Sequence, residues 1–197
     1  MSNSTFSNRK SPRLQNWNYG WSALYFVTIV TKSRVNYFGD ISDYVLTLSE
    51  IGLEVENQWL NTQVIRPDMK IKLDEFIVMP NHFHGIIGIG HNEFNSSAIN
   101  SSNNANDFQS DHSCIGTNAI HGAHDRKNIF GPQRKNLGSI IRGFKSSVTT
   151  FARRNHILFD WQERYHSNVI WDETAINKIR NYIRSNPKKW KQDRFRK

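Results

Sequence analysis

The sequence has a single cysteine, no long hydrophobic run and a shortage of acidic residues. One cysteine, Cys114, excludes an intrachain disulfide framework and a zinc site built from several cysteines. No apolar stretch approaches the roughly 20 residues of a membrane-spanning helix, and the polar first residues lack the apolar core of a signal peptide. We therefore predict a soluble cytoplasmic protein with no membrane partner.

Basic residues outnumber acidic ones by 26 to 17, which gives a formal net charge of +9. This balance favours a polyanionic partner such as nucleic acid, although a basic surface without a partner is also consistent with it. Only 37% of the residues are hydrophobic, and the deficit is concentrated in an Asn- and Ser-rich stretch at 91–132. That stretch predicts a flexible insert within one domain spanning residues 1–197, which ends in a basic tail at 188–197.

The apolar periodicity predicts an α+β fold. Runs of β-branched and aromatic residues predict strands at 23–31, 70–79 and 85–89, and a short extended pair or one bent strand at 158–172. Apolar residues spaced by three and four predict helices at 49–64, at 135–154 and from 172 to just before Pro187. This order is typical of an antiparallel sheet with helices packed on one face, in a ferredoxin-like or RRM-like arrangement.

His82 and His84 stand two residues apart in the sequence MPNHFHG, at 79–85. On a strand their side chains project from one face, whereas Phe83 points into the core. Two neutral imidazoles make part of a site for a divalent metal ion, which a third protein ligand and a substrate oxygen would complete. Two polar residues on a solvated strand face would show the same pattern.

Tyr182 and Asn186 lie four positions apart and share one face of the last predicted helix. A tyrosine oxygen can attack phosphorus and can later leave again, so that a broken strand is rejoined without ATP. Because an unperturbed phenol has a pKa near 10, a nearby divalent cation must polarise the phosphate, and the Asn186 amide oxygen could be one of its ligands. The alternative for Tyr182 is simple packing against the sheet.

Basic residues on helix 135–154 and in the tail predict contacts with DNA. Arg142 and Lys145 lie three apart beside two serines, an arrangement suited to phosphates. In the tail, Trp190 and Phe195 alternate with basic residues and could stack on bases, although a frayed, solvated terminus is the alternative. The predicted DNA-binding residues are Arg142, Lys145, Arg153, Arg154, Lys188, Lys189, Lys191 and Arg194.

The motifs together resemble one protein family. MPNHFHG (79–85) is similar to the HUH motif, His-hydrophobic-His, of single-tyrosine transposases. Further matching segments are YFVTI (25–29), LSEIG (48–52), GFKS (143–146), WQERYH (161–166) and YIRSNP (182–187). With them the chain closely resembles the REP-associated tyrosine transposases over roughly residues 9–190, apart from the insert.

This resemblance implies a metal-dependent transposase or endonuclease that cleaves and rejoins single-stranded, hairpin-bearing DNA similar to repetitive extragenic palindromes. It implies Mg²⁺ or Mn²⁺ bound by His82 and His84, and Tyr182 as the nucleophile that forms a 5′-phosphotyrosine and frees a 3′-hydroxyl. Asn186 stands where insertion-sequence relatives have a Gln as third ligand. One tyrosine per site is compatible with a monomer or a homodimer.

Three alternatives stay open. Tyr165 is a competing nucleophile, in a motif typical of a strand. A non-catalytic nucleic-acid-binding module on an RRM-like sheet would use Phe83 and the basic tail as contacts. Replication-initiation or relaxase-type nicking would share the chemistry and differ in its substrate.

Overall fold

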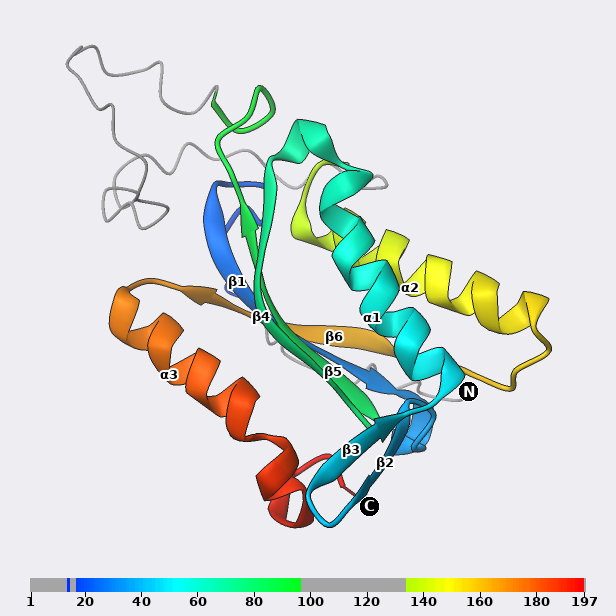
Figure 1. The fold of residues 1–197 in the computed structure, drawn as a ribbon. Coiled ribbons are helices and arrows are strands. Elements are labelled where there is room, and N and C mark those ends of the chain that lie inside the picture. The colour runs from blue at the N-terminus through cyan, green and yellow to red at the C-terminus, as the bar shows by residue number, and fades with distance from the viewer. Residues whose placement is uncertain (1–13, 15–16, 97–133, 197) are drawn as a thin grey trace, which may run out of the picture.

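Four antiparallel strands form the central sheet, in the order β4-β5-β1-β6 (Figure 1). The computed structural model describes residues 14, 17–96 and 134–196. The strands are β1 (Ala23–Thr31), β4 (Ile71–Met79), β5 (His82–Ile89) and β6 (Trp161–Ile170). The predicted α+β fold with an antiparallel sheet is confirmed. The histidines belong to β5 itself, and the stretch at 158–172 contains one strand instead of a pair.

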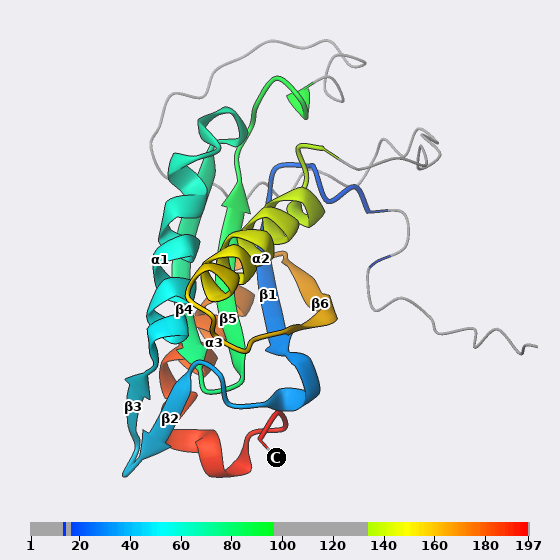
Figure 2. The ribbon, with the colours of Figure 1, turned by 90° about the vertical axis from the view of Figure 1, so that its right-hand side faces the viewer.

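Helices α1 (Glu50–Val64) and α2 (Leu137–Arg154) pack on one face of the sheet, as predicted (Figure 2). Helix α3 (Glu173–Ser185) lies on the opposite face (Figure 1). The starts of all three helices are fixed by side-chain caps, which accept hydrogen bonds from first-turn amides. The capping residues are Ser49, Asn136 and Asp172.

The main core lies between the sheet and helices α1 and α2. Phe83 on β5 is completely buried there, with its ring 4.6 Å from Trp59 of α1 and 5.6 Å from Phe144 of α2. Gly85 follows on the same face, and a Cβ there would come within 2.8 Å of the Trp59 and Phe83 rings. A residue without a side chain therefore lets these two large rings pack closely against the strand.

The other face of the sheet carries a second, smaller apolar cluster under α3. It contains Ile86 of β5 and Ile170 of β6, which pack with Ile176 and Ile183 of the helix. Because side chains alternate along a strand, β5 directs Phe83 towards the main core and directs His82 and His84 towards α3.

A short hairpin, β2 (Gly39–Ser42) with β3 (Val45–Leu48), projects beyond the sheet and was not predicted from the sequence. The predicted basic tail forms a 3₁₀ helix, Pro187–Gln192, and continues to residue 196. Most of the predicted insert at 91–132 lies outside the described residues, which resume at 134. In the described part of the chain, no helix combines the length and apolar character of a membrane span.

Candidate nuclease site

Helix α3 brings Tyr182 to the two histidines of β5. The Tyr182 hydroxyl lies 3.1 Å from Nε2 of His84, although the two residues are 98 positions apart in the chain. Both histidines are fully buried, whereas Tyr182 remains 38% exposed. The site therefore joins a solvent-accessible phenol to an imidazole pair that protein atoms shield from water.

A bulge in β4 holds α3 in this position. The pairing of β4 with β5 shifts register between Leu73 and Phe76, so Asp74 and Glu75 both bind α3 although they are neighbours in sequence. Asp74 accepts from Arg180 Nε at 2.9 Å and from its Nη2 at 2.5 Å, and Glu75 accepts from Arg184 Nε at 3.0 Å. These two ion pairs flank Tyr182 along the helix and fix its distance from β5.

The Asp74–Arg180 ion pair gives a testable pH dependence. The hydrogen bond from Arg180 lowers the pKa of Asp74 below its ordinary value, so the pair stabilises the folded protein above that value and the stabilisation is lost as pH falls. We expect Asp74→Asn to lower the unfolding free energy by about 0.5–1 kcal/mol at pH 7. In urea titrations, the difference in unfolding free energy between wild type and Asp74→Asn should be smaller at pH 3.5 than at pH 7. Asp43→Asn, at the exposed hairpin tip, is the control, and a deficit that grew on acidification would contradict the prediction.

Two polar side chains orient the histidines. Thr28 lies opposite His84 in the β1–β5 register, and its Oγ1 is 2.9 Å from His84 Nδ1. Asn81 Oδ1 lies 2.9 Å from His82 Nδ1. An amide oxygen only accepts hydrogen bonds, so His82 Nδ1 carries the proton and its Nε2 keeps a free lone pair. With the proton likewise on Nδ1 of His84, its Nε2 accepts the hydrogen bond from the Tyr182 hydroxyl.

Both imidazoles are neutral at physiological pH. Burial lowers the pKa of His84 to about 3, and the nearby positive charge of Arg194 acts in the same direction. Burial also places the pKa of His82 well below its ordinary value, with further contributions from His84 and Arg194. For Tyr182, burial raises the phenol pKa, and a hydrogen bond with the Asn186 side chain opposes this effect. Neutral imidazole is the form of histidine that binds metal ions.

The donor atoms in the site fit a divalent metal ion. Two atoms of the site, His82 Nε2 and Asn186 Oδ1, are among the buried side-chain atoms that have no hydrogen-bond partner within the described residues. A buried polar atom without a partner is costly, and a bound ion is one way to satisfy it. The same part of the chain contains no group of three or more His, Cys, Asp or Glu side chains placed so that together they could hold a metal ion. Any ion held by these histidines and Asn186 would therefore have only neutral protein ligands.

The C-terminal segment forms one wall of the site. Phe195 is buried with its ring 4.7 Å from that of His82, and the guanidinium of Arg194 lies 4.6 Å from the Phe195 ring centroid. Asn81 Nδ2 fastens this segment by donating to the backbone carbonyl of Phe195, at 2.8 Å, and it also donates to the carbonyl of Arg34 after β1, at 3.1 Å. The proposed stacking of Trp190 and Phe195 on bases is therefore wrong, because both rings are buried.

The predicted DNA-binding residues fall into two groups. Those of α2 lie on the face of the sheet opposite Tyr182, and Lys145 donates from Nζ to the backbone carbonyl of Gln162 on β6, at 2.5 Å. Those of the tail follow Asn186 directly and lie at the histidine end of the sheet (Figure 1). The first group comprises Arg142, Lys145, Arg153 and Arg154, and the second comprises Lys188, Lys189, Lys191 and Arg194.

Two alternative roles conflict with the geometry. Tyr165 pairs with the core residue Ile29 and packs against the main cluster, on the side of the sheet away from the histidines. Phe83 is completely buried under α1 and α2, so its ring is not available as a base contact. Sequence reasoning missed Thr28, Asn81 and the docked C-terminal segment. Only Asn81 could have been found, because it directly precedes His82 within the motif.

The chain is similar in sequence to one known protein and in fold to a solved structure. No profile of a known protein family matches it. An uncharacterized protein of Haemophilus influenzae (strain Rd) is 33% identical over 197 residues, which covers 98% of this chain and 96% of that protein. A solved structure of a REP-associated tyrosine transposase bound to a REP hairpin matches with a TM-score of 0.52 and 13% identity, over 88% of this chain and 72% of that one. The chain thus belongs to the family of the Haemophilus influenzae protein, and its fold is that of the REP-associated tyrosine transposase, in agreement with the resemblance seen in the motifs.

Proposed function

We propose that this protein is a metal-dependent DNA transposase or endonuclease that cleaves and rejoins single-stranded, hairpin-bearing DNA through Tyr182. The observation that carries the proposal is the 3.1 Å approach of the Tyr182 hydroxyl to a buried, neutral imidazole, beside a second imidazole whose Nε2 has no partner among the described residues. A half-exposed phenol next to two prospective metal ligands is suited to attack on a phosphodiester.

The residues that would hold Mg²⁺ or Mn²⁺ are His82 and His84 through Nε2 and Asn186 through Oδ1. Since His84 Nε2 has a single lone pair, the ion would replace the hydrogen bond from the Tyr182 hydroxyl. When bound, the ion would polarise the scissile phosphate and offset its negative charge. Because all three ligands are neutral, the substrate phosphate would supply the compensating negative charge. We therefore expect the ion and the DNA to bind more tightly together than either binds alone.

The reaction itself exchanges one phosphoester for another. The Tyr182 oxygen attacks phosphorus, and the bond from phosphorus to the 3′-oxygen breaks. The phenol loses one proton and the freed 3′-oxygen gains one, so that no net proton is released. The product is a 5′-phosphotyrosine, and attack by a 3′-hydroxyl on it reverses the step and rejoins the strand. Arg194 places a positive charge near both histidines and Tyr182, where it would favour the approach of a phosphate.

The substrate is proposed from the chemistry of the site and the shared fold. The solved relative is bound to a REP hairpin, and the basic residues at 188–194 border the site here. A binding module that reads RNA or DNA on an open sheet is less well supported, since helices cover both faces of this sheet.

The decisive experiment is incubation of a labelled single strand carrying a hairpin with the wild-type protein, with Mn²⁺, with Mg²⁺ or with a chelator. Denaturing electrophoresis should show a covalent protein–DNA adduct that needs the divalent ion, and mass spectrometry of digested adduct should find the phosphate on the Tyr182 peptide. Binding that weakens with salt but gives no adduct under any condition would instead identify a binding module.

Asn81 offers a separate test of the metal site. Replacing it by Ala removes the acceptor for His82 Nδ1–H, the donor to the Phe195 carbonyl of the C-terminal segment and the donor to the Arg34 carbonyl. Loss of such a hydrogen bond behind a metal-binding histidine typically weakens metal affinity, so we expect a reduction of about 10- to 100-fold. Mn²⁺ titration followed by electron paramagnetic resonance would measure it. Asn177→Ala, on the exposed side of α3, should bind Mn²⁺ like the wild type, and equal affinity for Asn81→Ala would show that His82 needs no such support.

A further inference from the structure

The tip of the β2–β3 hairpin presents an aromatic ring to solvent. Asp43 and Tyr44 form its two-residue turn, and both have positive φ, 51° and 64°. Turns of this kind favour Gly, Asn or Asp, and a bulky residue in the left-handed region is uncommon. Tyr44 is nevertheless 61% exposed and belongs to neither apolar cluster, so packing within the described residues does not account for it.

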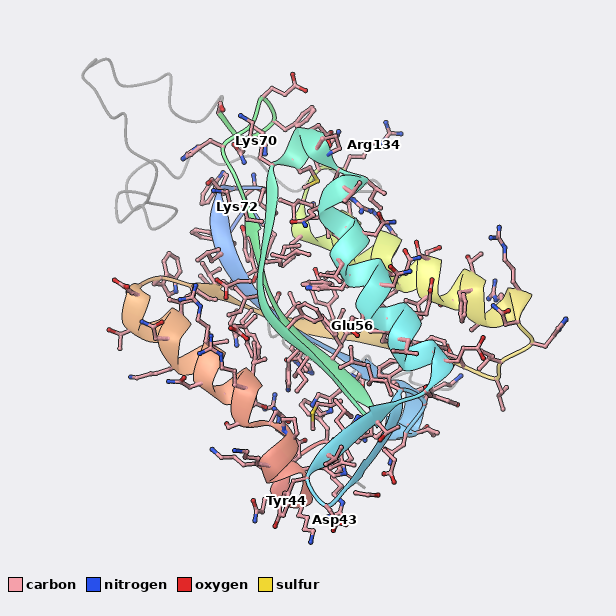
Figure 3. The ribbon with its side chains drawn as sticks, viewed as in Figure 1. Asp43, Tyr44, Glu56, Lys70, Lys72 and Arg134 are labelled. Carbon is pink, nitrogen blue, oxygen red and sulfur yellow. The ribbon has the colours of Figure 1, made fainter. Side chains whose placement is uncertain are left out.

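This tip lies beside the C-terminal segment (Figure 3). The Lys191 ammonium is 5.8 Å from the centre of the Tyr44 ring. Lys191 belongs to the 3₁₀ helix that directly follows Asn186, and the same segment continues to Arg194 and to Phe195 against His82. An exposed ring therefore stands at one end of a basic surface whose other end is the candidate nuclease site.

We propose that Tyr44 is a stacking platform for one unpaired base of the DNA strand that passes through the Tyr182 site, with Lys191 contacting the adjacent phosphate. The proposal rests on the function proposed above. Grooves for single strands combine cations that follow the backbone with exposed aromatic rings on which bases stack. The basic segment at 188–194 selects a polyanion as the occupant, and the exposed face of the ring accepts a base of any sequence.

The location of the ring also indicates which part of the substrate it would meet. A base paired within a hairpin stem is already stacked on both sides, so an isolated tyrosine can only receive an unpaired base, and we assign that base to the flank that continues from the cleaved phosphate. The platform would hold that flank while Tyr182 and the freed 3′-end remain in the site. Tyr44 is thus a residue that positions the strand, and it does not touch the reacting phosphate.

The test uses single strands that carry one hairpin and unpaired flanks, with an abasic nucleotide placed at each flank position in turn. Dissociation constants are measured by fluorescence anisotropy in chelator, so that no cleavage occurs. Wild type should lose about 5- to 100-fold in affinity when one particular base is missing. Tyr44→Phe should behave like wild type, whereas Tyr44→Ala should bind intact DNA with the same loss and be insensitive to the abasic site at that position.

Two further variants exclude a purely structural effect. Tyr44→Gly removes the ring but suits the left-handed backbone, so it should fold as well as wild type and still lose the stacking. Val45→Ala changes the neighbouring exposed side chain and should not alter affinity. The platform is refuted if Tyr44→Gly binds intact DNA like wild type, or if its defect is the same at every abasic position.

The platform and the nuclease proposal can fail separately. At saturating DNA with Mn²⁺, Tyr44→Gly should still form the Tyr182 adduct, because the ring lies outside the reacting atoms. An abasic-dependent Tyr44 effect without any adduct from wild type would support the platform and reject the strand cleavage. An adduct from wild type without a Tyr44 effect on binding would reject the platform alone.

Discussion

Replacing Tyr182 by Phe is expected to abolish the covalent protein–DNA adduct, with a loss on the order of 1,000-fold or more. The change deletes one oxygen atom, which is the proposed nucleophile and the partner of His84 Nε2 at 3.1 Å. Because the ring is part-exposed and α3 is held by its own ion pairs, the folded structure should remain, with an unfolding free energy reduced by no more than about 1 kcal/mol. Denaturing electrophoresis with Mn²⁺ and hairpin DNA measures the adduct.

The matched control is Tyr165→Phe. Tyr165 lies on β6 opposite Ile29 and packs towards the main core, so removal of its hydroxyl should leave the adduct unchanged. If the adduct survived in Tyr182→Phe and disappeared in Tyr165→Phe, Tyr165 would be the nucleophile. The placement of Tyr165 on the sheet face away from the histidines would then be wrong.

Replacing Phe83 by Ala is expected to have the largest effect on stability, a loss of about 3–5 kcal/mol in the unfolding free energy. Phe83 lies between His82 and His84 in the sequence, but its ring is completely buried on the opposite face of the sheet. There it packs against Trp59 and Phe144 in the main core. Neighbouring rings cannot collapse freely into the space, since they belong to different helices. Urea unfolding followed by tryptophan fluorescence measures the loss, because Trp59 lies against the altered position.

The control for Phe83 is Leu53→Ala on the exposed side of α1, which should change stability by less than about 0.5 kcal/mol. A loss below about 1 kcal/mol for Phe83→Ala would contradict the assignment of Phe83 to the core. Folded Phe83→Ala protein should still form the Tyr182 adduct, because Tyr182 and both histidine side chains lie on the other face of the sheet.

The parts of the structure that follow a local pattern could be predicted from the sequence. The strand at 23–31 coincides with β1, and helices α1 and α2 begin at Glu50 and Leu137, close to the predicted starts at 49 and 135. Alternation along β5 correctly separated Phe83 from the two histidines. The spacing of Tyr182 and Asn186 placed them on one helical face, and the structure brings that face to His84. The metal-binding and catalytic roles of these residues stay predictions.

Other features depend on contacts that no local pattern records. The β2–β3 hairpin was missed because its strands have four residues each and its turn, Asp43-Tyr44, lacks the glycine that usually marks such a turn. The position of Tyr165 required the β1–β6 register, which periodicity cannot supply. The docking of Phe195 on His82 depends on hydrogen bonds made by Asn81 to distant backbone carbonyls.

The docked C-terminal segment has a practical consequence for protein engineering. An affinity tag fused after residue 197 would be separated by only two residues from Phe195, which packs against His82, and would therefore crowd the candidate nuclease site. Strand β5 runs from His82 to Ile89, a distance of about 23 Å at roughly 3.3 Å per residue, so the chain on either side of the segment 97–133 is anchored far from that end. A fluorophore attached at residue 96 or 134 would thus leave the histidine end of the sheet unobstructed.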